Sequence, residues 1–170
     1  IIAAKGEAAA EAWAKGVKEN LARKPQGNDR AQVKAVFQGE CDVSLGNTYY
    51  MGLMQTNEKS PEQKEWAAAV NVVFPNQQDR GTHVNVSGAA VTKSAKNKEN
   101  AIKLIEFLTA DAAQKIYAED NFEYPVKPGV APSAVVRSWG TFKADDVLLS
   151  RVAEQRTLAT RIMDRVRFDN

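Results

Sequence analysis

Patterns typical of helices alternate along this chain with short segments typical of strands. Apolar residues recur every three to four positions over residues 3–24 and from residue 97 to about 121. Residues 41–45 and 82–88 instead alternate apolar and polar side chains, and residues 70–75 form a short, mostly apolar segment that is also expected to be a strand. The first spacing puts apolar side chains on one face of a helix, and the second puts them on one face of a strand. Helices that alternate with strands predict an α/β protein.

Local signals place the ends of several helices. After a polar loop at residues 25–29, Asn28 or Asp29 can cap a helix that runs to Phe37. Ser60 followed by Pro61 is typical of another helix start. The helical pattern of residues 97–121 predicts two helices with a break near residues 109–111, and residues 150–168 predict a terminal helix.

Composition excludes several classes of protein. The formal net charge is +2 and no block of basic residues occurs, which argues against nucleic-acid binding. No apolar run approaches the ~20 residues that span a bilayer, so we expect no membrane insertion. The chain opens on Ile1 and contains no signal peptide, which predicts a processed chain or a piece of a longer one.

The most conspicuous candidate site is the adjacent pair Tyr49 and Tyr50, with Asn47 before it and Gly46 and Gly52 on either side. Neighbouring side chains on a regular strand point to opposite faces, so this pair shares one target only if the backbone bends, as it can in a glycine-flanked loop. A phenolate oxygen is a hard donor suited to a highly charged cation. The alternative is that both tyrosines are amphipathic aromatics at the edge of a core.

Other chemically active side chains have no partner at a sequence spacing typical of a metal or catalytic site. Cys41 fits a small buried residue on its predicted strand. His83 has no second His, Cys or carboxylate at the spacing of metal ligands, which favours a structural histidine. Glu40 and Asp42 would share one strand face, an arrangement that is common at solvent. An enzyme that uses His83 or the tyrosine pair for acid–base work is a further alternative, but no second catalytic partner is apparent.

A series of short segments is distinctive in both residues and order. The segments are PQGNDR at 25–30, Gly39-Glu40 with Asp42, NTYYMG at 47–52, GTHVNVSG at 81–88, NKENA at 97–101 and EYPV at 123–126. Together they resemble the periplasmic ferric-iron-binding proteins of ABC importers, over most of residues 5–130. The resemblance implies a transferrin-like solute-binding protein with a type II periplasmic-binding-protein-like α/β fold, whose two lobes close over one Fe³⁺.

The resemblance also implies roles for individual residues. Tyr49 and Tyr50 match the adjacent phenolate ligands of the family. Asn47 matches an asparagine that contacts a bound synergistic anion in some members, and Asn28 lies near a second such position. The other ligands of the family come from regions that would precede Ile1. A related protein that binds another metal cation or a small anion is the alternative.

The resemblance divides the chain between the two lobes. Residues 1–79 and 131–170 are expected in the second lobe, which carries the tyrosine pair, and residues 80–130 in a segment that returns to the first lobe. The chain would then be the carboxyl-terminal half of a protein truncated at its N-terminus. Its expected partners are the missing N-terminal half, which would cover an apolar surface within residues 83–128, and an ABC permease.

Overall fold

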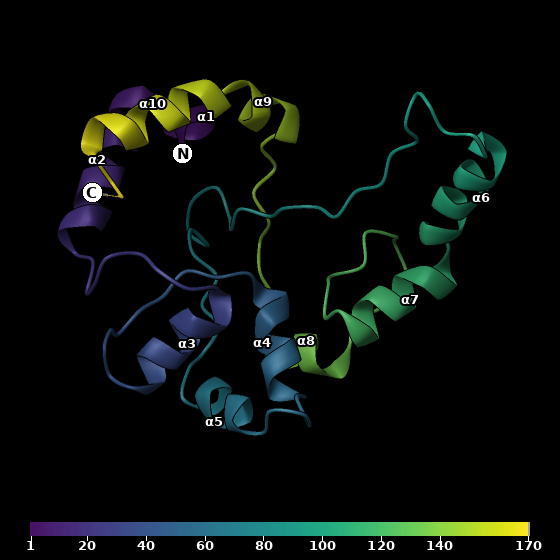
Figure 1. Ribbon diagram of the computed structural model, residues 1–170, viewed down its shortest axis with the longest axis horizontal. Coiled ribbons are helices and arrows are strands. Elements are labelled where there is room, and N and C mark those ends of the chain that lie inside the picture. Colours follow the sequence, from purple (N-terminus) through teal and green to yellow (C-terminus); the bar gives the residue numbers. More distant parts are fainter. Residues whose placement is uncertain (170) are drawn as a thin grey trace. The chain divides into compact units, whose positions relative to one another are not determined.

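The computed structural model describes residues 1–169, and helices dominate it (Figure 1). Contacts between Cα atoms divide the chain into two compact units. Unit 1 contains Ile1–Gly27, Phe74–Asn85 and the chain from Lys143 onward, and unit 2 contains Asn28–Val73 and Val86–Phe142. These boundaries differ from the expected lobe boundaries at residues 79, 80, 130 and 131. The lobe assignment concerns a complete two-lobed protein and stays a prediction.

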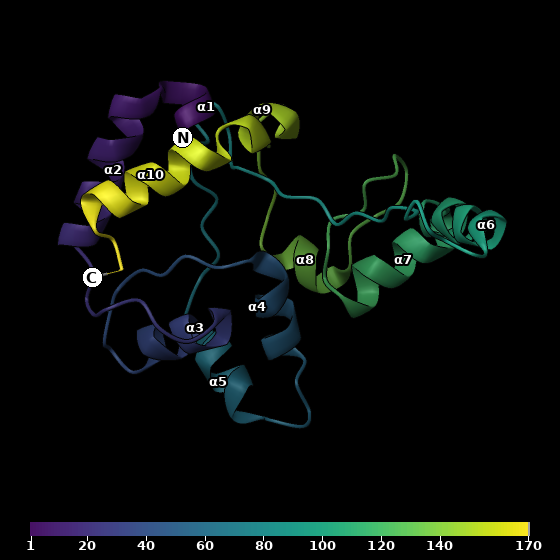
Figure 2. The ribbon, with the colours of Figure 1, turned by 45° about the horizontal axis from the view of Figure 1, so that its top comes forward.

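Unit 1 is built around two helices that lie side by side, α2 (Glu7–Glu19) and α10 (Arg156–Val166), as Figures 1 and 2 show. Their facing apolar side chains form a small core of Ala10, Ala14, Ile162 and Val166. The Lys18 ammonium donates to the carbonyl oxygen of Val166 at 3.0 Å, which satisfies one of the free carbonyls at the end of α10. The short helices α1 (Ile2–Lys5) and α9 (Leu149–Glu154) complete this unit.

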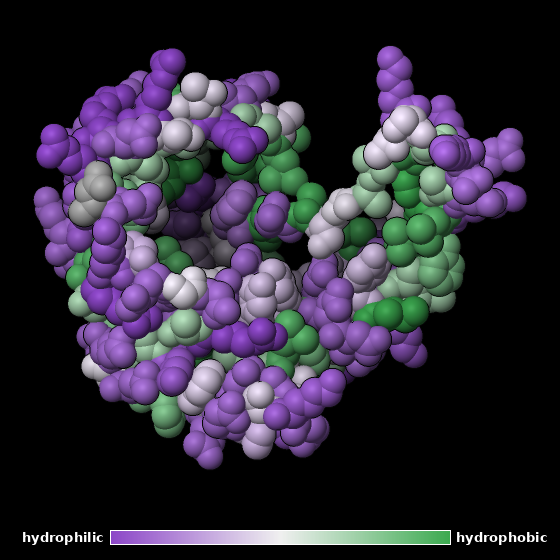
Figure 3. All heavy atoms as spheres, in the orientation of Figure 1, coloured by the Kyte–Doolittle hydropathy of each residue, from purple (hydrophilic) through white to green (hydrophobic). Residues whose placement is uncertain are grey.

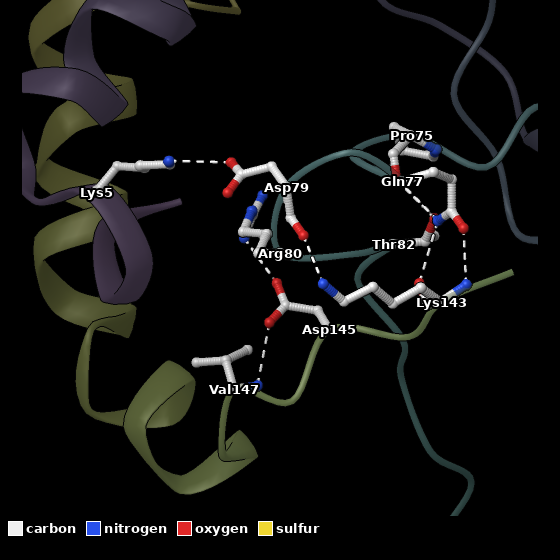
Figure 4. Close-up of polar contacts among 9 residues, drawn as sticks. All are labelled: Lys5, Pro75, Gln77, Asp79, Arg80, Thr82, Lys143, Asp145 and Val147. Atoms are coloured by element: carbon white, nitrogen blue, oxygen red, sulfur yellow. Dashed lines mark hydrogen bonds and ion pairs between the residues drawn. The ribbon is translucent and has the colours of Figure 1, made fainter.

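A polar cluster joins the two remaining segments of unit 1 (Figure 4). The backbone N–H of Thr82 donates to the carbonyl of Lys143, and the N–H of Asp145 donates to the carbonyl of Thr82, both at 2.8 Å. Gly81 lies directly before this contact with φ +98°, and a Cβ there would come within 2.7 Å of the Lys143 carbonyl oxygen. Glycine is therefore required at position 81 by its backbone angle and by the approach of the neighbouring segment.

Unit 2 has its core where α3 (Asp29–Phe37), α4 (Thr48–Gln55) and α5 (Glu62–Ala68) meet. Val33, Met51, Met54 and Ala67 are buried there, and Trp66 and Trp139 pack against them. The unit also contains α6 (Lys98–Leu108), α7 (Asp111–Asp120) and α8 (Ala134–Ser138). Hydrophobic side chains gather on the segment with α6 and α7 (Figure 3), where Leu104 and Ile116 are exposed.

The helix predictions are confirmed in part. Asn28 caps α3, and the break between α6 and α7 lies at residues 109–110, as expected. The predicted helix 3–24 is shorter, because Gly6 at φ +83° separates α1 from α2 and α2 ends at Glu19. The predicted terminal helix is divided at Gln155 into α9 and α10.

The three expected strands do not form ladders among residues 1–169, where the only bridge is an isolated parallel one between Thr82 and Ala144. A strand requires hydrogen bonds to a neighbouring strand, and the described residues supply no such partner at residues 41–45 or 70–75. The apolar positions of the first segment are consequently uncovered, with Val43 80% and Leu45 73% exposed.

Candidate metal centre

The tyrosine pair lies in the first turn of a helix, which corrects the expectation of a bent loop. Helix α4 begins at Thr48, so Tyr49 and Tyr50 are its second and third residues. Successive helical side chains are separated by about 100° around the axis, not 180° as on a strand. The two rings can therefore meet, and their centroids lie 4.4 Å apart with 37° between the ring planes. Both side chains are half-buried.

The residues just before α4 are held by the start of α3. Asp29 Oδ1 accepts a hydrogen bond from the backbone N–H of Asn47 at 2.7 Å and another from Asn47 Nδ2 at 3.2 Å. Asn28 performs a different task, since its Oδ1 accepts from the backbone N–H of Ala31 at 3.1 Å and so caps α3. Asn47 thus lies next to the tyrosine pair, whereas the observed contact of Asn28 is within α3.

Hydrogen bonding, burial and nearby charges all favour the protonated form of Tyr49. A hydrogen bond with Tyr50 raises the pKa of Tyr49, and burial raises it further. The charges of Tyr50, Asp29 and Glu123 act in the same direction. A cation that binds the Tyr49 oxygen must therefore displace a proton, because only the phenolate is a strong ligand.

Helix α4 packs against Phe122 at Gly52. A Cβ on Gly52 would lie 2.2 Å from Phe122 Cγ, and Phe122 is itself buried with φ +57°. At the end of the helix, Trp139 Nε1 donates to Gln55 Oε1 at 3.3 Å. The tyrosine pair is therefore carried on a helix that is held at its start, middle and end.

We expect Gly52→Ala to lower the free energy of unfolding by about 1–2 kcal/mol. The added methyl overlaps the Phe122 ring, and overpacking of this kind outweighs the ~1 kcal/mol that alanine contributes to helix formation. Urea denaturation followed by circular dichroism measures the effect. Gly16→Ala in α2 is the matched control, because a Cβ at Gly16 meets open space, and it should stabilise the protein. Equal effects of the two variants would contradict the packing argument.

Other candidate residues do not join the tyrosine pair. Within residues 1–169, no group of three or more His, Cys, Asp or Glu side chains is arranged to hold a metal ion. His83 belongs to unit 1, so it is not in the unit that contains the pair, and Cys41 is a half-buried free thiol. Sequence reasoning missed Asp29 and Phe122 as neighbours of the site, although Asp29 lies inside one of the distinctive segments.

Comparison with known proteins places the chain in a family. Residues 1–142 match the family model described as bacterial extracellular solute-binding protein. The chain belongs to this family. Iron uptake protein A1 of Synechocystis is 50% identical to this solute-binding protein over 96% of the chain and 45% of the relative. The chain thus spans about half the length of the curated relatives it matches.

Solved structures confirm the predicted fold class. Apo ferric ion-binding protein A of Pasteurella haemolytica superposes with a TM-score of 0.94 at 48% identity, over 99% of this chain and 52% of that one. A Trichodesmium protein solved with iron and citrate has a TM-score of 0.91 at 47% identity, over 97% and 52% of the two chains. This chain therefore has the type II periplasmic-binding-protein-like fold over about half of those structures.

No helix within residues 1–169 combines the length and hydrophobicity needed to cross a bilayer.

Proposed function

We propose that this solute-binding protein binds Fe³⁺ in the periplasm, with the phenolate oxygens of Tyr49 and Tyr50 as ligands, and delivers the ion to an ABC permease. The observation that carries the proposal is the placement of two phenol rings in contact within one helical turn, 4.4 Å apart between centroids. Phenolates are hard oxygen ligands and Fe³⁺ is a hard cation. Relatives named for iron uptake and ferric iron binding support the choice of ion.

The remaining ligands come from chain outside residues 1–170 under this proposal. Two phenolates leave most coordination positions of Fe³⁺ open. Because the relatives are about twice as long, a missing N-terminal half can supply the other ligands and cover the exposed apolar residues of α6 and α7. Residues 1–79 and 131–170 would then belong to the lobe with the tyrosine pair, and residues 80–130 to the other lobe.

Asn47 is the proposed contact for a synergistic anion beside the metal. Its Nδ2 carries two hydrogens, and the hydrogen bond to Asp29 uses one of them. Asn28 is the proposed second anion contact; its Oδ1 serves as a helix cap, so its Nδ2 is the group left for the anion. The proposed role is capture and release of an ion with no chemical turnover, so no catalytic residue is assigned.

Affinity for Fe³⁺ should rise with pH. Each phenol that becomes a ligand releases one proton, so each contributes a tenfold change in affinity per pH unit while the pH stays below its pKa. Because the pKa of Tyr49 is raised, neutral pH lies below this pKa and the tenfold dependence applies. Two phenolate ligands therefore predict an affinity that falls about 100-fold for each unit by which the pH is lowered.

The test is a titration with ferric nitrilotriacetate at about pH 6 and about pH 8, on the protein expressed at the full length that its gene encodes. A visible phenolate-to-iron charge-transfer band should appear, with tighter binding at the higher pH once the chelator's own pH dependence is subtracted. No band at either pH would overturn the proposal. Binding of Zn²⁺ or of citrate alone, without a band from Fe³⁺, would support the alternative of another cation or a small anion.

A further inference from the structure

The first turn of α3 makes direct contacts with the residues that begin α4. Asp29 Oδ1 holds both the backbone N–H and the side-chain amide of Asn47, at 2.7 and 3.2 Å. The same oxygen lies 3.3 Å from the position that a Cβ on Gly46 would occupy, so the loop passes close over the carboxylate. One carboxylate oxygen thus fixes the backbone at the residue that precedes the first turn of α4.

Arg30, the next residue of α3, contacts the tyrosine pair from its own side chain. Its guanidinium carbon lies 5.3 Å from the centroid of the Tyr50 ring, within the range of a cation–π interaction. Its Nε is buried and has no hydrogen-bond partner within the part of the chain that the structure describes. No described residue forms a hydrogen bond with that nitrogen. The contact with the Tyr50 ring is therefore the interaction that the structure shows for orienting the guanidinium.

We propose that Asp29 and Arg30 are positioning residues for the tyrosine pair, Asp29 through the backbone that begins α4 and Arg30 through the Tyr50 ring. The inference rests on the proposed function, because it concerns how the two phenol oxygens are presented to one ion. Neither residue need touch the metal. Metal ligands that are fixed before binding lose less freedom on binding, and loss of a group that orients a ligand typically costs about 10–100-fold in metal affinity.

A purely structural role for Asp29 predicts a different outcome from a positioning role. If Asp29 only joined α3 to α4, its loss would lower stability and leave the folded protein with unchanged iron affinity. A third possibility is an effect of its negative charge on Tyr49. Asp29→Asn removes that charge but retains a carbonyl oxygen that can accept both hydrogen bonds from Asn47, so this variant separates charge from positioning.

The experiment compares Asp29→Ala and Asp29→Asn by titration of the full-length protein with ferric nitrilotriacetate. We expect Asp29→Ala to weaken Fe³⁺ binding about tenfold or more and to shift the charge-transfer band, and Asp29→Asn to restore both. Ser133→Ala is the matched control. It also removes a hydrogen bond from a backbone N–H to a side-chain oxygen, here the cap of α8 from the Val136 N–H to Ser133 Oγ at 3.3 Å, elsewhere in unit 2. This control should lower stability without changing affinity or the band.

Arg30→Gln provides a second test that leaves the Asn47 contacts intact. A cation at the ring face stabilises the electrons of the Tyr50 phenolate, so its removal should move the band to longer wavelength. Arg30→Gln still tests the positioning role if Asp29→Ala fails to fold. Unchanged band and affinity in both Asp29→Ala and Arg30→Gln, beside a normal wild-type band, would overturn the inference alone. Absence of the band from the wild type would overturn the proposed function and this inference with it.

Discussion

Replacement of both Tyr49 and Tyr50 by phenylalanine should abolish the phenolate-to-iron band and lower Fe³⁺ affinity by more than about a thousandfold. Phenylalanine preserves each ring, so the contact between the rings at 4.4 Å can persist while both oxygens are lost. Loss of a residue that merely orients a ligand typically costs 10–100-fold in metal affinity, and loss of the ligand itself should cost more. The single variants should each retain a weakened band, because one phenolate remains.

Tyr124→Phe is the matched control for this experiment. Tyr124 lies in the same unit, contacts Phe142 edge to face at 5.2 Å between centroids, and has a buried hydroxyl without a partner among the described residues. Burial raises the pKa of Tyr124, and the pKa of Tyr49 is shifted in the same direction, so the control removes a comparable phenol that is not part of the pair. The control should bind iron as the wild type does. A double Tyr49 and Tyr50 variant that kept the band and the affinity would show that these tyrosines are not the ligands.

The parts of the fold that local signals specify were predictable. The Asn28 cap and the break between α6 and α7 depend on residues within one turn of the position they affect, and both are present in the structure. The start of α5 shows the limit of such signals. Ser60 makes no capping hydrogen bond there, and Asn57 instead accepts hydrogen bonds from the backbone N–H groups of Lys59 and Ser60 at 3.0 Å.

The strands and the surroundings of the site depend on contacts that are distant in sequence. Residues 41–45 have the strand pattern, but a strand also needs a neighbour, and the described residues provide none there. Asp29 lies 18 residues from Asn47, so the pairing that holds α4 cannot be seen as a local motif. Gly52 and Phe122 meet only in the folded unit. Sequence could therefore identify the two tyrosines as chemically unusual, but not the three contacts that hold their helix.

The largest expected effect on stability comes from Arg80→Met in unit 1. Arg80 Nη1 donates to Asp145 Oδ2 at 2.8 Å, and the Asp145 side chain is only 3% exposed (Figure 4). The other oxygen of Asp145 accepts from the backbone N–H of Val147 at 3.0 Å. Methionine fills much of the volume of arginine but leaves the carboxylate buried without a cation. We expect the free energy of unfolding to fall by about 3 kcal/mol, measured by urea denaturation.

Two further variants distinguish the effect of a buried carboxylate without a cation from the effect of losing an exposed ion pair. Lys5→Met breaks the pair between Lys5 and Asp79, whose side chains are 53% and 58% exposed, and it should leave stability almost unchanged. Adding Asp145→Asn to Arg80→Met removes the uncompensated charge and should recover part of the loss. The amide protons of Thr82 and Asp145, which donate between the two segments, should exchange faster in Arg80→Met than in the double variant. Equal changes in the free energy of unfolding for Arg80→Met and Lys5→Met would contradict the argument that burial of Asp145 makes the Arg80 contact important.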